Sequence, residues 1–300
     1  MSYFERAILA AALTGVTCGF VGALVLLRRR TFFAQALTHA TYPGAVVAAA
    51  CGWAVPVGAA MSAIVLVGLL TVLGRLRRQG TSAATGIVLT GGFALGTLLQ
   101  ASLPGLPVQV ESFLFGSILT VTGGDLTITA TVLVVALVLV VGCARYLVFA
   151  TADPTGYRAA GYRAWPIEAL VLAVIAMTVV AALPAVGAIL AIALIAAPAA
   201  AVRRWAPTFG TLLLGSAIVG GCAAVCGVLV SRSWDVPAGP AITLIATGVF
   251  VLSLALPRRA GAAARGIRAE TVREIPSQTG TSRTEFLGRE SPTRRPSDRR

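Results

Sequence analysis

The only histidine of the chain, His39, lies in a stretch that is otherwise apolar enough to cross a membrane. Gln35, Thr38 and Tyr42 are three or four residues away from it, or from one another, so the four polar side chains share one helix face. Polar groups inside a bilayer need partners or a water-filled cavity, and an imidazole can bind a transition metal. This pattern favours a stripe that contacts a passing cation. A histidine that only hydrogen-bonds a neighbouring helix would give the same pattern.

Pro43 and Gly44 follow the polar stripe directly. Proline lacks the backbone N–H that a helix needs, so the helix is expected to break here. Broken helices commonly line the binding sites of transporters. The sequence therefore predicts that the stripe lies at an interrupted membrane helix.

Cys222 and Cys226 are a second candidate metal-binding group, because they lie four residues apart and share a helix face. Thiolates select soft metals, which makes them a candidate soft-metal pair. Cysteine also replaces alanine or serine in membrane helices without any chemical role, and this alternative stays open. The five cysteines show no disulfide pattern.

The composition excludes a soluble enzyme and predicts a polytopic membrane protein. Apolar residues make up 57% of the chain and charged residues only 12%, against about 25% charged residues in soluble domains. All 24 basic residues are arginine. A chain without lysine has neither the P-loop lysine that contacts nucleotide phosphates nor a Schiff-base lysine. If ATP drives this protein, another chain must hydrolyse it.

Charge-free segments of about 20 residues indicate where helices cross the bilayer. They predict an all-α fold with about nine transmembrane helices, eight to ten in all. The expected spans are 8–27, 33–53, 57–73, 85–103, 126–143, 167–183, 186–202, 209–230 and 241–256. The stretch 111–126 is short and amphipathic, and we expect it to be interfacial or re-entrant.

Arginine positions predict the orientation of these spans. When the Arg28–Arg30 side is assigned to the cytoplasm and the spans alternate, 11 of the 13 arginines before Pro257 fall on that side. The positive-inside rule then places the N-terminus outside and the C-terminus in the cytoplasm. Most of the arginines of this basic chain thus flank hydrophobic segments, where they determine topology, so no nucleic-acid partner is expected.

The chain is expected to contain a membrane domain, residues 1–256, and a tail, residues 257–300. The tail has eleven arginines, five acidic residues and few large apolar residues. Such a composition predicts a disordered cytoplasmic segment. Its charge would attract it to anionic membrane lipid, unless it is a dispensable extension.

Five motifs occur in order between about Arg28 and Leu256. They are Phe32-Phe33-x-Gln35-Ala36-Leu37-Thr38-His39-x-x-x-Pro43-Gly44, then Ala84-Thr85-Gly86-Ile87, then residues 113–119 with Asp125, then 183–187 with 193–200, and Asp235-x-Pro237-x-Gly239. This ordered set resembles the sequence pattern of the ABC-3 permeases, the membrane subunits of bacterial zinc and manganese ABC importers. Two positions differ from that pattern, because Gln35 and Ser82 stand where the family has acidic residues.

The resemblance implies a bacterial plasma-membrane protein of the ABC-importer transmembrane-domain type. Two permease copies would form the pathway, an extracytoplasmic metal-binding protein would deliver the ion, and a separate ABC ATPase would drive alternating access. Zn²⁺, or next Mn²⁺, would be the transported substrate, with no permanently bound cofactor. An imidazole ligand favours zinc by a small margin.

Residues 152–161 resemble the loop helix with which these permeases dock onto their ATPase. The resemblance covers Asp153, Pro154, Arg158, Ala159 and Gly161. The residues themselves agree, because aspartate can cap a helix that starts at a proline and glycine can end one. An ordinary linker between two helices is the alternative.

Two other classes of function remain as alternatives. An ion-coupled carrier without an ATPase would need titratable groups inside its spans, and His39 is nearly the only one. An intramembrane enzyme is suggested by Gly123-Gly124-Asp125, but no second carboxylate lies within a span.

Overall fold

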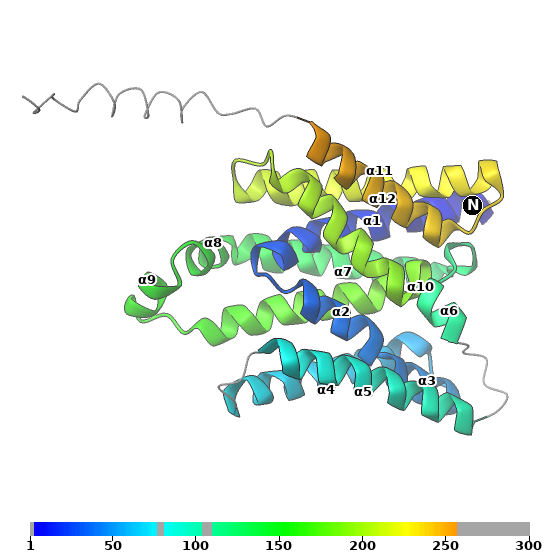
Figure 1. The fold of residues 1–300 in the computed structure, drawn as a ribbon, viewed down its shortest axis with the longest axis horizontal. Coiled ribbons are helices and arrows are strands. Elements are labelled where there is room, and N and C mark those ends of the chain that lie inside the picture. The colour runs from blue at the N-terminus through cyan, green and yellow to red at the C-terminus, as the bar shows by residue number, and fades with distance from the viewer. Residues whose placement is uncertain (1–2, 77–80, 104–109, 257–300) are drawn as a thin grey trace, which may run out of the picture. The chain divides into compact units, whose positions relative to one another are not determined.

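The computed structural model describes residues 3–76, 81–103 and 110–256, and these residues form helices with no strand among them (Figure 1). The elements are α1 (Tyr3–Leu27), α2 (Thr31–Ala40), α3 (Tyr42–Ala50), α4 (Val55–Leu76), α5 (Thr81–Ser102), α6 (Val110–Phe115), the 3-10 turn η1 (Ile118–Thr120), α7 (Gly123–Gly142), α8 (Ala144–Ala152), α9 (Pro154–Ala159), α10 (Ala164–Arg203), α11 (Phe209–Trp234) and α12 (Ala238–Ala255). The predicted all-α membrane fold is confirmed. The predicted tail, residues 257–300, lies outside the described residues.

Six of the described helices are long and apolar enough to cross a membrane: α1, α5, α7, α10, α11 and α12. The difference from about nine spans has three causes. The expected span 33–53 is divided into the short helices α2 and α3, and α4 has a shorter apolar run, Val55–Leu70. The expected spans 167–183 and 186–202 both lie within α10.

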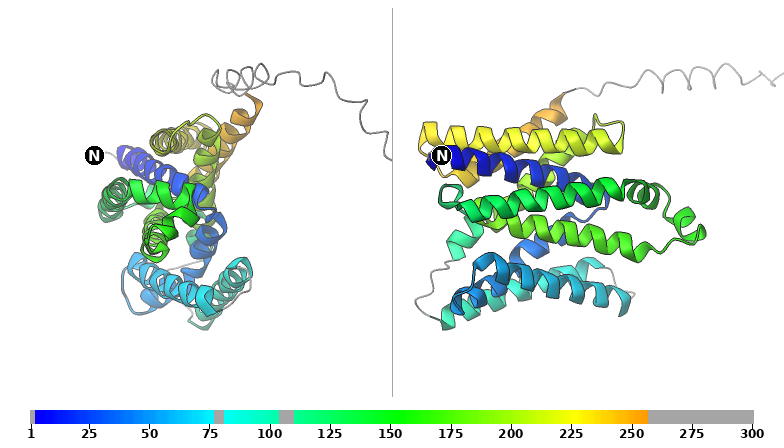
Figure 2. Two further views of the ribbon diagram at one scale, coloured as in Figure 1. Left: turned by 90° about the vertical axis from the view of Figure 1, so that its left-hand side faces the viewer. Right: turned by 180° about the vertical axis from the view of Figure 1, so that it is seen from behind.

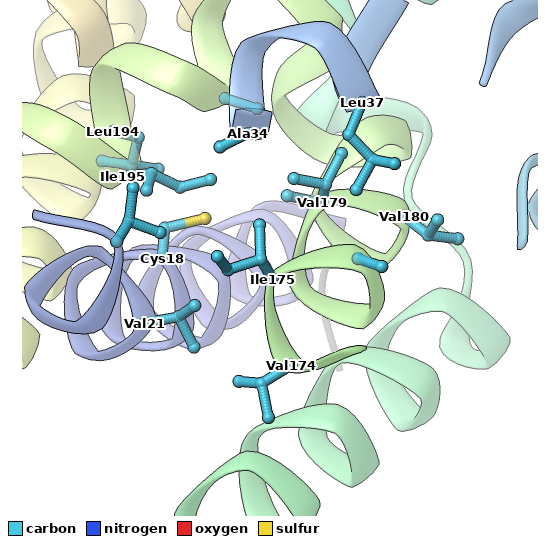
Figure 3. Close-up of a cluster of buried hydrophobic side chains, with 14 of the residues drawn as sticks. Cys18, Val21, Ala34, Leu37, Val174, Ile175, Val179, Val180, Leu194 and Ile195 are labelled. Atoms are coloured by element: carbon cyan, nitrogen blue, oxygen red, sulfur yellow. The ribbon is translucent and has the colours of Figure 1, made fainter. Parts of the chain in front are cut away.

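Helix α10 contains two crossings joined at Gly187. A straight helix of its 40 residues would be about 60 Å long, twice the roughly 30 Å of a bilayer core. Gly187 interrupts it with φ 77° and ψ 170°, which is not helical. Figure 3 shows Ile175 and Ile195, one from each half, on either side of Cys18 of α1. In a straight helix these two residues would be about 30 Å apart, so the two halves fold back on each other.

Helix α1 packs closely against α11 and the second half of α10. An added Cβ at Gly15 or Gly19 would collide with the backbone oxygen of Gly220 or Ser216, and one at Gly22 with that of Ile195. Glycine at these positions lets the backbones touch. This packing by small residues is typical of membrane helices, where no hydrophobic effect drives helix association.

The expected interfacial segment 111–126 forms the short helix α6 and the turn η1, which pack on the turn of α10. Gly116 and Gly187, both at positive φ, meet so closely that a Cβ on either would collide with the backbone nitrogen of the other. The Ser117 amide donates a hydrogen bond to the Pro184 carbonyl at 3.1 Å. Two motifs that are 70 residues apart in sequence thus form one structural unit.

Helices α3, α4 and α5 form a layer beside the other helices, and α2 connects the two (Figures 1 and 2). The start of α1 lies at one end of the bundle and α9 at the other. Arg28, Arg30 and Arg158 line one cavity at the α9 end, so these arginines share one side of the bundle.

We expect Gly187→Ala to destabilise the fold, because its φ and ψ are open only to glycine and its Cβ has no space. Holding alanine in this backbone conformation would by itself lower the free energy of unfolding by about 1–3 kcal/mol. The measurement is the thermal unfolding midpoint of the full chain in detergent. Gly248→Ala is the matched control, because a Cβ there meets nothing within 4 Å. Equal midpoints for the two variants would contradict the turn at Gly187.

Candidate functional site

The predicted polar stripe lies where α2 ends and α3 begins. His39 is nine residues after Arg30, which is about 13 Å along a helix. If Arg30 marks the edge of a bilayer core of roughly 30 Å, His39 would lie near its middle. Helix α2 ends at Ala40 and α3 begins at Tyr42. The expected break of this span is therefore present.

Two neighbouring helices hold the break in place. The Ser62 hydroxyl of α4 donates a hydrogen bond to the Ala40 carbonyl at 3.0 Å. The Tyr42 hydroxyl donates one to Oε1 of Gln100 on α5. The Tyr42 ring also packs on Phe113 of α6, with ring centroids 4.7 Å apart. Sequence reasoning missed these partners, although Gln100 is a polar residue inside a predicted span.

The four residues of the stripe do not have the same surroundings. Gln35 is exposed and His39 is partly exposed, and the His39 ring packs edge-on against Phe93 at 5.7 Å. Thr38 and Tyr42 are fully buried. The Thr38 hydroxyl donates a hydrogen bond to the backbone carbonyl of Gln35 at 2.7 Å. Of the four stripe residues, Gln35 and His39 alone therefore have side chains at the surface of the single chain.

Among the residues that the structure describes, no cluster of strong metal ligands surrounds His39. Within the described ranges, no group of three or more His, Cys, Asp or Glu side chains is placed to hold a metal ion. A closed zinc site needs four such ligands and a catalytic one needs three. A cation at His39 would have to complete its coordination with water, with amide oxygen such as that of Gln35, or with groups from another chain.

A cavity of about 380 Å³ lies beyond the break, between α4, the α6–η1 segment, α7 and the turn of α10. Phe113, which contacts Tyr42, and Asp125 are part of its lining. The Asp125 carboxylate accepts hydrogen bonds from the Thr122 amide (2.9 Å) and hydroxyl (2.7 Å). These bonds cap the start of α7. Asp125, the residue that suggested an intramembrane enzyme, therefore has a structural role.

Cys222 and Cys226 are both exposed on α11. Ile218 and Leu229, on the same helix, are also exposed, at 55% and 45%. This face carries apolar side chains of the kind that contact lipid, and the structure brings no further ligand to the two thiols among the described residues. The soft-metal pair stays a prediction.

Helix α9 forms where the sequence places it. The Asp153 carboxylate caps it by accepting hydrogen bonds from the Gly156 amide (2.8 Å) and the Thr155 hydroxyl (2.7 Å). These two bonds, the amide first, lower the pKa of Asp153. After the helix, Gly161 takes a left-handed φ of 81°, the usual conformation of a glycine that ends a helix.

Aromatic rings hold α9 against the loop that follows it. Tyr157 is buried, stacks on Tyr162 at 5.1 Å and contacts Phe149 at 5.4 Å. The predicted docking residues are instead exposed: Asp153, Pro154, Arg158, Ala159 and Gly161. One side of this short helix is therefore anchored and the other is open to a partner.

The sequence model of the ABC 3 transport family matches residues 1–257. The chain belongs to this family. It is 29% identical to the manganese transport system membrane protein MntC of Halalkalibacterium halodurans, over 91% of this chain and 94% of that one. It is 32% identical to the zinc transport system membrane protein TroC of Treponema pallidum, over 85% and 89%. A chelated iron transport system membrane protein, YfeC of Yersinia pestis, is 27% identical over 92% and 93%.

Solved structures agree with this membership of the ABC 3 transport family. PsaBC from Streptococcus pneumoniae, in complex with Fab, matches with a TM-score of 0.77 at 25% identity, over 90% of this chain and 96% of that one. A putative metal-chelate type ABC transporter in an inward-facing conformation has the same fold, with a TM-score of 0.68 at 16% identity. The chain is thus a multi-pass permease subunit of an ABC transporter and not an enzyme.

We expect Asp153→Ala to loosen α9 in this permease, because it removes the acceptor for the Gly156 amide. The measurement is hydrogen–deuterium exchange of residues 154–160, which should become faster. Asp153→Asn is the matched control, because asparagine caps helices as well as aspartate does. Unchanged exchange in the alanine variant would show that the cap does not hold the helix.

Proposed function

We propose that this ABC 3 permease imports a divalent metal ion, zinc first and manganese next, by alternating access driven by a separate ATPase subunit. The observation that carries the proposal is an interrupted membrane helix with two polar side chains, Gln35 and His39, at the surface of the single chain. The family relationship and the named metals of its relatives support it. An extracytoplasmic binding protein would deliver the ion.

The pathway would lie between two copies of the chain. Gln35 is exposed at membrane depth, where a polar side chain is costly against lipid and normally faces a water-filled cavity or another protein chain. His39 is on the same side, one turn further along α2. A second copy would cover both residues and could supply the ligands that one chain lacks.

The chemistry of these ligands bears on the metal. Imidazole suits zinc and other borderline cations, whereas manganese prefers hard oxygen ligands. Gln35 offers an amide oxygen without charge. Weak coordination of the metal ion by these side chains suits transport, because the ion must dissociate from the site again. We infer that His39 is the main contact, with Gln35 next to it and the buried Thr38 and Tyr42 supporting the break.

Orientation and coupling follow from the arginines and α9. We propose that the α9 end of the bundle faces the cytoplasm, because the arginines gather there, and that the N-terminus is outside. The exposed side of α9, with Asp153 and Arg158, would then meet the ATPase. The absence of lysine from the chain requires that the partner hydrolyse ATP.

His39→Leu should abolish zinc-dependent growth of cells that rely on this importer, because it removes the one imidazole of the pathway. The readout is cellular zinc and manganese content, measured element by element, together with the amount of protein in the membrane. Val47→Leu is the matched control, because Val47 is exposed on α3 of the same broken span. Unchanged uptake by His39→Leu would remove the site assignment.

Asp153→Ala should also lower metal-stimulated ATP hydrolysis of the complete transporter, and Asp153→Asn should leave it near wild type, because coupling needs a formed α9. Arg158→Glu should lower it through charge at the docking side. The rate is measured in reconstituted vesicles with the ATPase present. Metal uptake by the permease without any ATPase would instead favour the ion-coupled carrier.

A further inference from the structure

A cavity of about 180 Å³ lies at the α9 end of the bundle, between the end of α1, the start of α2, α8, α9 and the start of α10. Arg28, Arg30 and Arg158 line it, together with Glu168 and Tyr157. Metal transport as proposed above assigns no role to this cavity. Its volume, about six times that of a liquid water molecule, suffices for a phosphate group.

Arg28 is the unusual residue of this cavity. Its Nε and Nη2 atoms are buried and have no hydrogen-bond partner in the part of the chain that the structure describes. Burial, and then the charge of Arg30, lower the pKa of Arg28, but a guanidinium stays charged in proteins. Buried N–H donors without an acceptor are unfavourable, so a ligand that supplied acceptor atoms to Nε and Nη2 would bind favourably.

The net positive charge of the cavity lining favours an anionic ligand. Arg30 forms an ion pair with Glu168, which leaves the charges of Arg28 and Arg158 uncompensated by any carboxylate of the lining. A planar guanidinium with adjacent N–H donors matches the oxygen atoms of a phosphate, to which it binds with two parallel hydrogen bonds. Two such groups from different elements can hold one phosphate between them.

The cavity lies at the level where lipid phosphates are found. Arg28 directly follows Leu27, the last residue of a membrane helix, and the apolar run of α10 begins beside the cavity. Tyr162 and Trp165, 46% and 56% exposed, lie close in sequence to its lining. Such aromatic side chains gather at the boundary between membrane and water. Basic pockets between membrane helices at this level bind anionic headgroups.

We propose that Arg28 and Arg158 bind the phosphodiester group of an anionic membrane lipid in this cavity, next to the Arg30–Glu168 ion pair. The lipid phosphate would connect the end of α1 to α9, because Arg28 directly follows α1 and Arg158 belongs to α9. The lipid would thereby help to hold α9 in position.

The test is native mass spectrometry of the full chain in mild detergent, titrated with phosphatidylglycerol and, separately, with phosphatidylcholine. Wild type should prefer phosphatidylglycerol. Arg28→Gln should weaken that preference about tenfold or more, the value of a hydrogen bond to a charged group. Arg29→Gln removes the same charge from an exposed neighbour that does not line the cavity, and should weaken it less than fivefold.

Arg158→Gln keeps the test informative if Arg28→Gln fails to fold, because Arg158 is exposed; it should also weaken the preference more than Arg29→Gln does. Inorganic phosphate at the same concentration should not displace the lipid. Equal effects of Arg28→Gln and Arg29→Gln would overturn the proposal in favour of general surface charge. Binding of inorganic phosphate without any preference for phosphatidylglycerol would overturn it in favour of a free-anion site.

Discussion

Backbone amide and carbonyl groups inside a bilayer must find hydrogen-bond partners within the protein, and this requirement acts at two interruptions of membrane-spanning segments among the described residues. At the break between α2 and α3, Ser62 of α4 donates to the Ala40 carbonyl. At the turn of α10, the Ser117 amide donates to the Pro184 carbonyl. In both places another part of the chain supplies the partner that lipid does not offer.

The same requirement explains why small residues surround these interruptions. Partners can reach a broken helix only if the backbones come close, and glycine permits this. Gly116 and Gly187 meet at the turn of α10, and Gly92 and Gly96 of α5 lie against Ala40 and Tyr42 at the break between α2 and α3. These contacts set the position of the α2–α3 break, and Gln35 and His39 lie on the helix that ends there. The proposed pathway between two chains would use this polar pair.

The two ends of the bundle have different chemistry. The end that contains α9 carries arginines and aromatic rings, and its short helix is set by a local cap from Asp153. The opposite end contains the α6–η1 segment and a cavity partly lined by Asp125. This polarity fits a permease that receives a cation at one end and a mechanical signal at the other. The cavity around Arg28 adds a site of opposite charge preference, which concerns the surrounding lipid and not the transported ion.

The sequence by itself determined the membrane class, most of the spans and the short helix α9, because length, hydropathy and helix caps are local properties. It also located the break after His39, since Pro43 acts on its own helix. The tertiary structure alone decided that Thr38 and Tyr42 are buried while Gln35 is exposed, and that Tyr42 bonds Gln100. It also decided that Nε and Nη2 of Arg28 have no hydrogen-bond partner among the described residues. Helical spacing says which residues share a face, but only the packing of distant helices says what covers that face.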